Sequence, residues 1–373
     1  MSEGQLFGGI FKGKKILVTG NTGFKGSWLT LWLNSLGASI IGYSLDPPTD
    51  PSLFEILKLE KNITQIKGDV RNKEYLQKTV EQFKPDIVFH LAAQPLVRSS
   101  YEEPHLTYET NVMGTVNLFE AVRNTDSVRV VVNITSDKCY KNREADYSYK
   151  EQDPMGGFDP YSSSKGCSEL VTLAYINSFF SHGYVSLASV RAGNVVGGGD
   201  WAVDRIIPDC IRALVQEKPV LVRSPQAVRP WQHVLEPLSG YLWLAACMWQ
   251  NDHKYDGAWN FGPNKESNIT VKAVVESVIN EWGSGRWEQS NQIKAQPHEA
   301  GLLMLDHSKA RKLLLWQPIY GINRTLEVTT NWYKAYYDNS NIKQVTLANL
   351  NDYIKQAKKQ NLSWTLVNQK VGV

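Results

Sequence analysis

The sequence predicts an α/β protein with a doubly wound parallel sheet and a smaller α/β lobe after it. Three observations lead to this prediction. Short apolar runs alternate with helical patterns over the first half, glycines follow the first run, and the alternation stops near residue 190. Apolar runs without a two-residue alternation are typical of strands buried on both faces, and their alternation with helices is typical of a doubly wound sheet.

The expected strands of the first half are short apolar runs at residues 15–19, 39–44, 86–91, 129–134 and 184–190. Apolar residues at helical spacing predict helices between them, at residues 28–36, 112–123 and 161–180. We therefore expect residues 1–190 to form one Rossmann-type domain, in which ligands bind at the carboxyl ends of the strands.

The second half is expected to form a smaller lobe over residues 191–340, interleaved with the first domain. A glycine-rich segment at 193–201 opens it, and helices are expected at 206–215, 231–249 and 271–282. Residues 341–373 are polar and rich in lysine, with an expected helix at 347–359. Their charge indicates a solvated helical appendage.

The charge balance and hydropathy exclude several classes of function. The chain has 40 Lys and Arg against 37 Asp and Glu, and its basic residues are dispersed, which argues against a nucleic-acid partner. No apolar run approaches the ~18 residues of a membrane span, and residues 1–12 lack the apolar segment of a signal peptide. We expect a cytoplasmic protein that has no membrane partner.

Cysteine and histidine patterns also exclude some chemistry. The four cysteines are far apart and lack C-x-x-C pairing, so we expect reduced thiols. The seven histidines lack metal-ligand spacing, and we expect no catalytic metal.

A dinucleotide site is predicted where the first strand meets the first helix. Gly20, Gly23 and Gly26 are spaced three apart there, with Phe24 in the same turn. Glycine permits the tight turn and lets a pyrophosphate approach the helix N-terminus.

Further cofactor contacts are expected after the next strands. Gly68, Asp69 and Val70 have the form that holds an adenine ring, and Leu91, Ala92, Ala93 and Gln94 let the backbone pass close to the cofactor. The acid that usually binds the ribose would fall near Ser44, and the nearest acid is Asp46. Because no Arg follows this strand to meet a 2′-phosphate, we expect NAD.

A Tyr–Lys pair opens the helix expected at 161–180. Tyr161 and Lys165 are four residues apart and so share one helix face. We expect the charge of Lys165 and of the cofactor to lower the pKa of the phenol, which makes Tyr161 a base near neutral pH. Ser136, Asp137 and Lys138 follow the preceding strand, at the same edge of the sheet.

Together these segments resemble the extended short-chain dehydrogenase/reductase family, from about residue 14 to about residue 335. The resemblance rests on the glycines 20, 23 and 26, the segment 91–94, Ser136 and the Tyr161/Lys165 pair. Within that family, an acid and a base after Ser136 resemble the nucleotide-sugar 4,6-dehydratases. The segments 23–28, 137–140, 197–201 and 229–231 are similar to the branch that acts on CDP-glucose.

The resemblance implies a lyase reaction. It implies that Tyr161 removes the proton from the sugar O4, Ser136 hydrogen-bonds O4, Lys138 takes the C5 proton and Asp137 protonates the departing C6 hydroxyl. Lys165 would hold the nicotinamide ribose. Substrate contacts are implied for Asn194, Arg205, Arg229 and His233.

The resemblance also implies partners and a setting. The substrate would be a nucleotide sugar, CDP-glucose, and the product would enter deoxysugar biosynthesis of the lipopolysaccharide O-antigen kind. Apolar stripes on more than one side of the helices 112–123 and 161–180 indicate a homodimer or homotetramer.

Three alternatives stay open. An inverting 4,6-dehydratase also has Asp-Lys after the strand, but those relatives tend to lose the tyrosine that Tyr161 retains. A 4-epimerase or simple reductase is disfavoured by Asp137 and Lys138. An NAD-binding sensor or scaffold without turnover is disfavoured because Tyr161 and Lys165 are both present.

Overall fold

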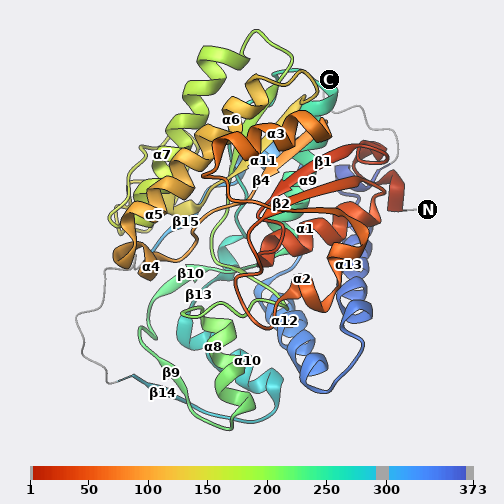
Figure 1. Ribbon diagram of the computed structural model, residues 1–373. Coiled ribbons are helices and arrows are strands. Elements are labelled where there is room, and N and C mark those ends of the chain that lie inside the picture. Colours follow the sequence, from red (N-terminus) through yellow and green to blue (C-terminus); the bar gives the residue numbers. More distant parts are fainter. Residues whose placement is uncertain (1–2, 291–301, 367–373) are drawn as a thin grey trace.

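The computed structural model describes residues 3–290 and 302–366, and its centre is a seven-stranded sheet (Figure 1). The strand order is β12-β7-β5-β4-β1-β2-β3, and every neighbouring pair is parallel. The strands are β1 (Lys15–Thr19), β2 (Ser39–Ser44), β3 (Thr64–Lys67), β4 (Ile87–His90), β5 (Val130–Ile134), β7 (Ser186–Arg191) and β12 (Gly257–Asn260). The chain reverses its direction of travel across the sheet between β1 and β4, which confirms the doubly wound fold.

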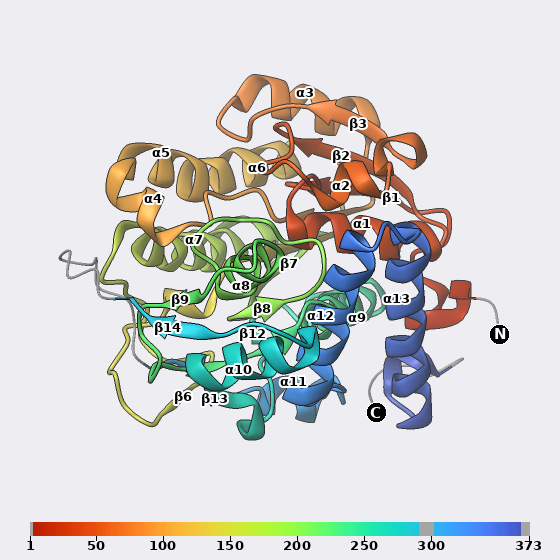
Figure 2. The same cartoon turned by 90° about the horizontal axis from the view of Figure 1, so that it is seen from below.

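Helices cover both faces of the sheet (Figures 1 and 2). One face carries α3 (Lys73–Phe83), α6 (Gly114–Arg123) and α7 (Pro160–Tyr175); the other carries α1 (Phe24–Ser35) and α9 (Leu235–Gln250). Successive strand residues serve opposite faces: Leu17 packs in the cluster under α3 and α6, whereas Val18 packs in the cluster under α1 and α9. This double burial explains why the strands are apolar throughout.

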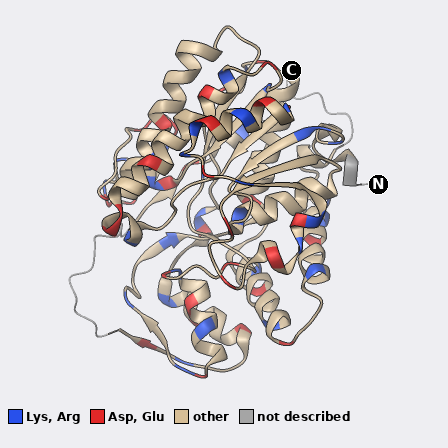
Figure 3. Ribbon diagram, in the orientation of Figure 1, with Lys and Arg blue, Asp and Glu red and all other residues tan. Residues whose placement is uncertain are grey.

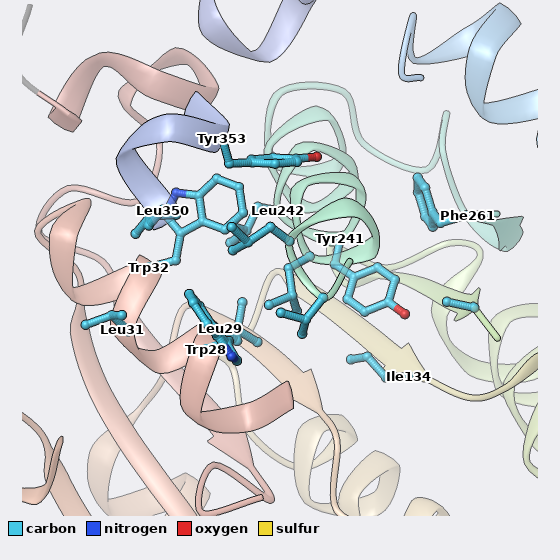
Figure 4. Packing of buried hydrophobic residues seen from close by; sticks show 14 of the residues in the cluster. Trp28, Leu29, Leu31, Trp32, Ile134, Tyr241, Leu242, Phe261, Leu350 and Tyr353 are labelled. Atoms are coloured by element: carbon cyan, nitrogen blue, oxygen red, sulfur yellow. The ribbon is translucent and has the colours of Figure 1, made fainter. Parts of the chain in front are cut away.

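The larger core has an aromatic centre (Figure 4). Trp28 and Trp32 of α1 face Tyr241 and Leu242 of α9, and all four are fully buried. Buried aromatic side chains of this size contribute strongly to the hydrophobic stabilisation of a core.

The C-terminal segment is not a solvated appendage, and that expectation was wrong. Its helix α13 (Ile342–Lys359) packs on α12 (Ile322–Tyr337), and Leu350 and Tyr353 are buried in the larger core. After the helix, Trp364 stacks on Phe7 with ring centroids 5.0 Å apart. The apolar positions of α13 recur at helical spacing among the lysines, so one stripe of the helix is buried while the charges face water.

The second half forms a lobe beyond the carboxyl ends of the strands (Figure 1). It contains the helices α8 (Ile206–Val215) and α10 (Val271–Trp282), at the expected residues, and two pairs of short strands. The pairs are β9 (Val220–Val222) with β14 (Trp287–Gln289), and β10 (Val228–Pro230) with β13 (Asn268–Thr270). The seventh sheet strand, β12, also comes from this half.

Shorter α-helices and β-strands lie between these elements. They are α2 (Leu53–Ile56), α4 (Val97–Glu102), α5 (Pro104–Tyr108), α11 (Ser308–Leu313), β6 (Ser148–Tyr149), β8 (Val195–Val196), β11 (Gln232–His233) and β15 (Met304–Leu305). The pair β8–β11 delays the start of α9, which begins at Leu235 rather than at residue 231. The helix expected at 161–180 is α7 followed by a π-helical turn, Ile176–Phe180.

Candidate active site

A cavity of about 1000 Å³ opens at the carboxyl ends of the sheet strands, where the lobe faces them. Every site residue expected from the sequence lines this cavity except His233. The lining residues among them are Gly20, Gly23, Phe24, Gly26, Asp69, Val70, Leu91, Ala92, Ala93, Gln94, Ser136, Asp137, Lys138, Tyr161, Lys165, Asn194, Arg205 and Arg229.

The glycine turn is packed too closely for side chains at two of its three positions. Gly20 has a φ of +70°, and a Cβ there would lie 2.7 Å from the backbone nitrogen of Ala92. A Cβ on Gly26 would lie 2.2 Å from the carbonyl oxygen of Gly20. Gly23 is the N-cap of α1, and no side chain caps that helix. The N-terminal N–H groups of α1 are therefore directed at the cavity side of the turn.

On the β2–β3 side, the acidic groups are held by neighbouring cations. Asp46 follows β2, lines the cavity and forms an exposed ion pair with Lys67 at 2.6 Å. Asp69 follows β3 and is bound by Arg71 at 2.6 Å. Although partial burial raises the pKa of Asp69, the hydrogen bonds and charge of Arg71 outweigh it, and the net pKa is lowered. Both carboxylates are thus charged acceptors beside the cavity.

The segment after β4 is fixed by its own hydrogen bonds. The backbone N–H of Gln94 donates to Asn111 Oδ1 at 2.8 Å, and its side-chain Nε2 donates to Thr107 Oγ1 at 2.9 Å. Ala92 N donates to Thr19 Oγ1 at 3.2 Å. These bonds hold the small residues of this segment at the wall of the cavity.

The turn after β5 presents a hydroxyl, a carboxylate and an ammonium in succession. Ser136 Oγ donates to Asp137 Oδ1 at 3.0 Å and accepts from Lys138 N at 3.3 Å. Asp137 is buried, whereas Lys138 is half-buried. A Cβ on Gly193 would lie 1.8 Å from Asp137 Oδ2, so only glycine at 193 leaves room for this carboxylate.

Helix α7 begins at a cap that places Tyr161 and Lys165 at the cavity. The carboxylate of Asp159 accepts from Ser162 N at 2.9 Å and from Ser162 Oγ at 2.6 Å, and Pro160 occupies the first helical position. Both features favour helix initiation at this point. Tyr161 and Lys165 then lie one turn apart, buried on the face toward the cavity.

Burial shifts the pKa values of both members of this pair. It raises the pKa of Tyr161 to about 12, although a hydrogen bond with Ser136 lowers it. Burial also lowers the pKa of Lys165 to about 8. For the protein side chains alone, loss of solvation therefore has a larger effect on Tyr161 than the neighbouring charges, and the expected lowering of its pKa depends on the charge of the cofactor.

The lobe brings cations and an amide to the opposite wall. Arg205 precedes α8 and forms an ion pair with Asp200 at 2.7 Å. Arg229 lies on β10, and Asn194 lies in the loop after β7. Figure 3 shows that basic and acidic positions are interspersed along most elements, as the charge balance suggests. Arg205 and Arg229 face the cavity, where an anionic ligand would meet them.

His233 is not part of the cavity wall, which corrects its expected substrate role. Its ring is fully buried between the rings of Trp28 and Tyr320, with centroids 6.1 and 5.7 Å away. Burial lowers the pKa of His233 to about 3, so the ring is neutral. His298, to which the sequence assigns no role, lies outside the described residues.

The cavity wall also contains charged residues for which the sequence predicted no role. Lys25, within the quoted segment 23–28, lines the cavity between Asp137, Lys165 and Arg205. Burial, together with the charge of Arg205, lowers the pKa of Lys25 to about 8. Its position between two glycines of the turn was the available signal.

Two other observations concern function. Among the described residues, no group of three His, Cys, Asp or Glu side chains is placed to hold a metal ion. No helix in the described part of the chain has the length and apolarity needed to cross a membrane.

A doubly wound sheet with a glycine turn after β1 and a Tyr–Lys pair facing a Ser-Asp-Lys turn defines an enzyme of the short-chain dehydrogenase/reductase type. The sequence model described as GDP-mannose 4,6 dehydratase matches residues 17–329, and the chain belongs to this family.

Curated relatives support that membership. A CDP-glucose 4,6-dehydratase of Salmonella typhimurium is 50% identical over 352 residues, covering 92% of this chain and 97% of the relative. A dTDP-glucose 4,6-dehydratase of Xanthomonas campestris is 27% identical, covering 85% of this chain and 92% of the relative.

Solved structures share the fold. The dTDP-glucose 4,6-dehydratase of Bacillus anthracis, in complex with NAD, has a TM-score of 0.73 at 23% identity, covering 87% of this chain and 98% of that chain. The UDP-glucose 4-epimerase of Thermus thermophilus, also in complex with NAD, has a TM-score of 0.73 at 21% identity, covering 86% and 99%.

Proposed function

We propose that this chain is a CDP-glucose 4,6-dehydratase, an NAD-dependent lyase that forms CDP-4-dehydro-6-deoxy-D-glucose and water from CDP-D-glucose. The observation that carries the proposal is the Ser136-Asp137-Lys138 turn facing Tyr161 and Lys165 across one cavity. The 50% identity to the Salmonella typhimurium enzyme supports CDP-glucose as the substrate. The product is a precursor for deoxysugar biosynthesis, of the kind that supplies lipopolysaccharide O-antigen.

The residues around the glycine turn fit NAD. A Cβ would collide with backbone at Gly20 and Gly26, whereas one at Gly23 would have only the Gly20 oxygen, at 3.4 Å, as a neighbour. We assign the pyrophosphate to this turn, the ribose hydroxyls to Asp46, the adenine to Asp69 and Val70, and the remaining cofactor contacts to Phe24 and the segment 91–94. When bound, NAD supplies a hydride acceptor for C4 of the sugar and a hydride donor for C6.

The oxidation at C4 falls to Ser136 and Tyr161. Ser136 forms a hydrogen bond with O4, and Tyr161 takes the O4 proton. Since burial raises the pKa of Tyr161 to about 12 even with the hydrogen bond to Ser136 in place, this step needs a positive environment around the phenol. Lys165, one helical turn away, supplies part of it and binds the nicotinamide ribose.

The elimination falls to Asp137 and Lys138. The 4-ketone acidifies the C5 hydrogen, and Lys138 in its neutral form accepts that proton. Asp137 in its protonated form gives a proton to the C6 hydroxyl, which departs as water. A proton then returns to C5 from Lys138, so that the sugar has lost one water in total.

The lobe side of the cavity is assigned to the CDP group. Arg205 and Arg229 supply cations for its diphosphate, and Asn194 supplies an amide beside them. The ion pair with Asp200 fixes the position of the Arg205 guanidinium, which still lines the cavity.

The test is incubation of the purified protein with CDP-glucose and, in parallel, with UDP-, dTDP- and GDP-sugars, followed by mass spectrometry and NMR. We expect loss of one water from CDP-glucose alone, without net NADH. Isomerisation without water loss would instead assign an epimerase. Bound NAD with no change in any donor would assign a sensor or scaffold.

We also propose an oligomer, a homodimer or homotetramer. Large apolar side chains are exposed along α7 and the turn after it, at Leu170, Leu173 and Phe179, and at Met113 beside α6. Such faces on adjacent helices suit a four-helix contact between two copies. Sedimentation of the wild-type protein and of Leu170→Asp tests this, because a monomeric wild type would contradict it.

The remaining assignments concern location and division of the chain. We propose the cytoplasm, where the four free cysteines stay reduced. We also propose that residues 1–190 bind the cofactor and 191–340 bind the nucleotide sugar, with 341–373 as an added C-terminal segment.

A further inference from the structure

A buried ion pair lies directly behind the Tyr161–Lys165 pair and has no role in the chemistry above. Glu169 is on α7, one turn beyond Lys165 and two turns beyond Tyr161. Its carboxylate is 2.7 Å from Arg191 Nη2, and both side chains are 3% exposed. A fully buried pair of this kind costs desolvation energy, so its position calls for a reason other than stability.

The carboxylate of Glu169 connects α7 to two strand ends. Its Oε1 accepts from Thr135 Oγ1, and its Oε2 accepts from Ser189 Oγ at 2.6 Å. Thr135 is the residue immediately before Ser136. One carboxylate therefore ties the helix that carries Tyr161 and Lys165 to the turn that carries Ser136 and Asp137.

Arg191 extends the connection to the far side of the turn. Its Nη1 donates to Tyr140 Oη at 2.5 Å and to the carbonyl oxygen of Glu151 at 3.1 Å. The Tyr140 hydroxyl in turn donates to Asn260 Oδ1 at 2.8 Å, on the edge strand β12. The ion pair thus sits where α7, β5, β7 and β12 meet beneath the catalytic turn.

Glu169 is also the carboxylate that acts on Lys165. The charged and titratable groups around this ammonium are Glu169 on α7, Cys139 after the turn, His90 on β4 and Lys25 on α1. Burial lowers the pKa of Lys165, and Glu169 is the first of the groups that raise it again. Burial also lowers the pKa of His90 to about 3, so that ring brings no charge.

We propose that Glu169 is a positioning residue for the dehydratase reaction, one that keeps Lys165 protonated and fixes the Ser136 turn against α7. This inference rests on the proposed function, in which the Lys165 ammonium supports the Tyr161 base. The buried partner Arg191 allows the carboxylate to stay charged at this depth.

The test compares Glu169→Gln with the double variant Glu169→Gln/Arg191→Met. The single variant leaves a buried guanidinium unpaired and is expected to lose stability, whereas the double variant removes both charges and is expected to regain melting temperature. In both, loss of the carboxylate lowers the pKa of Lys165. The alkaline limb of kcat/KM for CDP-glucose is expected to move to lower pH by roughly one unit.

A matched control is Glu236→Gln, which removes another fully buried carboxylate, on α9 and away from the cavity. It is expected to lower the melting temperature and leave the pH limb in place. A double variant that regains both stability and the wild-type limb would overturn the proposal, because Glu169 would then act only as a structural residue.

A direct titration separates this inference from the proposed function. NMR of the lysine side chains, with Lys165 assigned through Lys165→Arg, reports the pKa of Lys165 without any turnover. A lower pKa in both Glu169 variants is expected. An unchanged pKa of Lys165 would overturn the proposal even if the enzyme dehydrates CDP-glucose. Because the titration needs no turnover, it also tests the proposal if the enzyme proves not to dehydrate CDP-glucose.

Discussion

At the residue scale, the cavity wall depends on missing side chains as much as on those present. Asp137 occupies the space that a side chain on residue 193 would need, and Gly26 meets the carbonyl oxygen of Gly20 in the same way. A single methyl group at either position must move backbone or a buried carboxylate.

Gly193→Ala should therefore displace Asp137 and lower kcat strongly, by about 10-fold or more. Gly321→Ala is the matched control, because a Cβ there meets nothing within 4 Å. Steady-state kinetics with CDP-glucose check the pair. Equal activity of the two variants would show that Asp137 need not occupy its observed position.

Tyr161→Phe should keep the fold and lose about 10² to 10⁴ in kcat, since the phenol is the assigned base at O4. Because only one hydroxyl is lost at the wall of a cavity, the variant should still bind NAD, which calorimetry can measure. Retention of near wild-type turnover would remove Tyr161 from the chemistry.

Residue roles were partly predictable from the sequence. The glycine triad and the Tyr161/Lys165 spacing are local patterns, so their meeting at one cavity followed from the strand order. His233 was misassigned because its distance from the cavity depends on the packing of Trp28 and Tyr320, which no local pattern encodes. Lys25 and Glu169 were missed because charged residues on helices are usually solvated.

At the element scale, the start of α7 is decided by one side chain. Asp159 lies directly before Pro160 and caps the helix through Ser162, three residues further on. Where the helix begins determines which side chains face the cavity, so the cap links local structure to the site.

Asp159→Ala should lower the free energy of unfolding by about 0.5–2 kcal/mol, because the first turn of α7 loses its acceptor. Asp159→Asn retains an N-cap oxygen and should lose much less. Urea denaturation of the two proteins measures the difference, and equal losses would mean that the charge rather than the cap matters.

The buried strands were the most predictable elements. β1 and β2 lie at the expected residues because their apolar runs are buried on both faces. β12 was missed, since Gly257 to Asn260 contain a single large apolar residue and the strand exists through pairing with β7. Tertiary pairing of this kind leaves little local signal.

At the scale of the whole molecule, the two ends of the chain close the larger core together. Phe7, Trp32, Tyr353 and Trp364 form one aromatic group, with Trp364 stacked on Phe7. The C-terminal segment therefore belongs to the folded body. Its apolar stripe was not predicted from the sequence because the segment is polar overall.

Trp364→Ala should cost about 3–5 kcal/mol of unfolding free energy, because it empties a fully buried indole site. The exposed Lys355→Ala, on the same segment, should be close to neutral. Guanidinium denaturation measures the free energy of unfolding of both variants. A small loss for Trp364→Ala would mean that the C-terminal segment contributes little to the core.

In the proposed reaction, a hydride leaves C4 of CDP-glucose and returns to C6 as water departs, all within one cavity. Turnover of CDP-glucose carrying deuterium at C4 tests it most directly, with the product read by mass spectrometry and NMR. We expect a product that has lost one water and carries the deuterium at C6. Loss of the label to solvent, or a product that still contains the C6 hydroxyl, would contradict it.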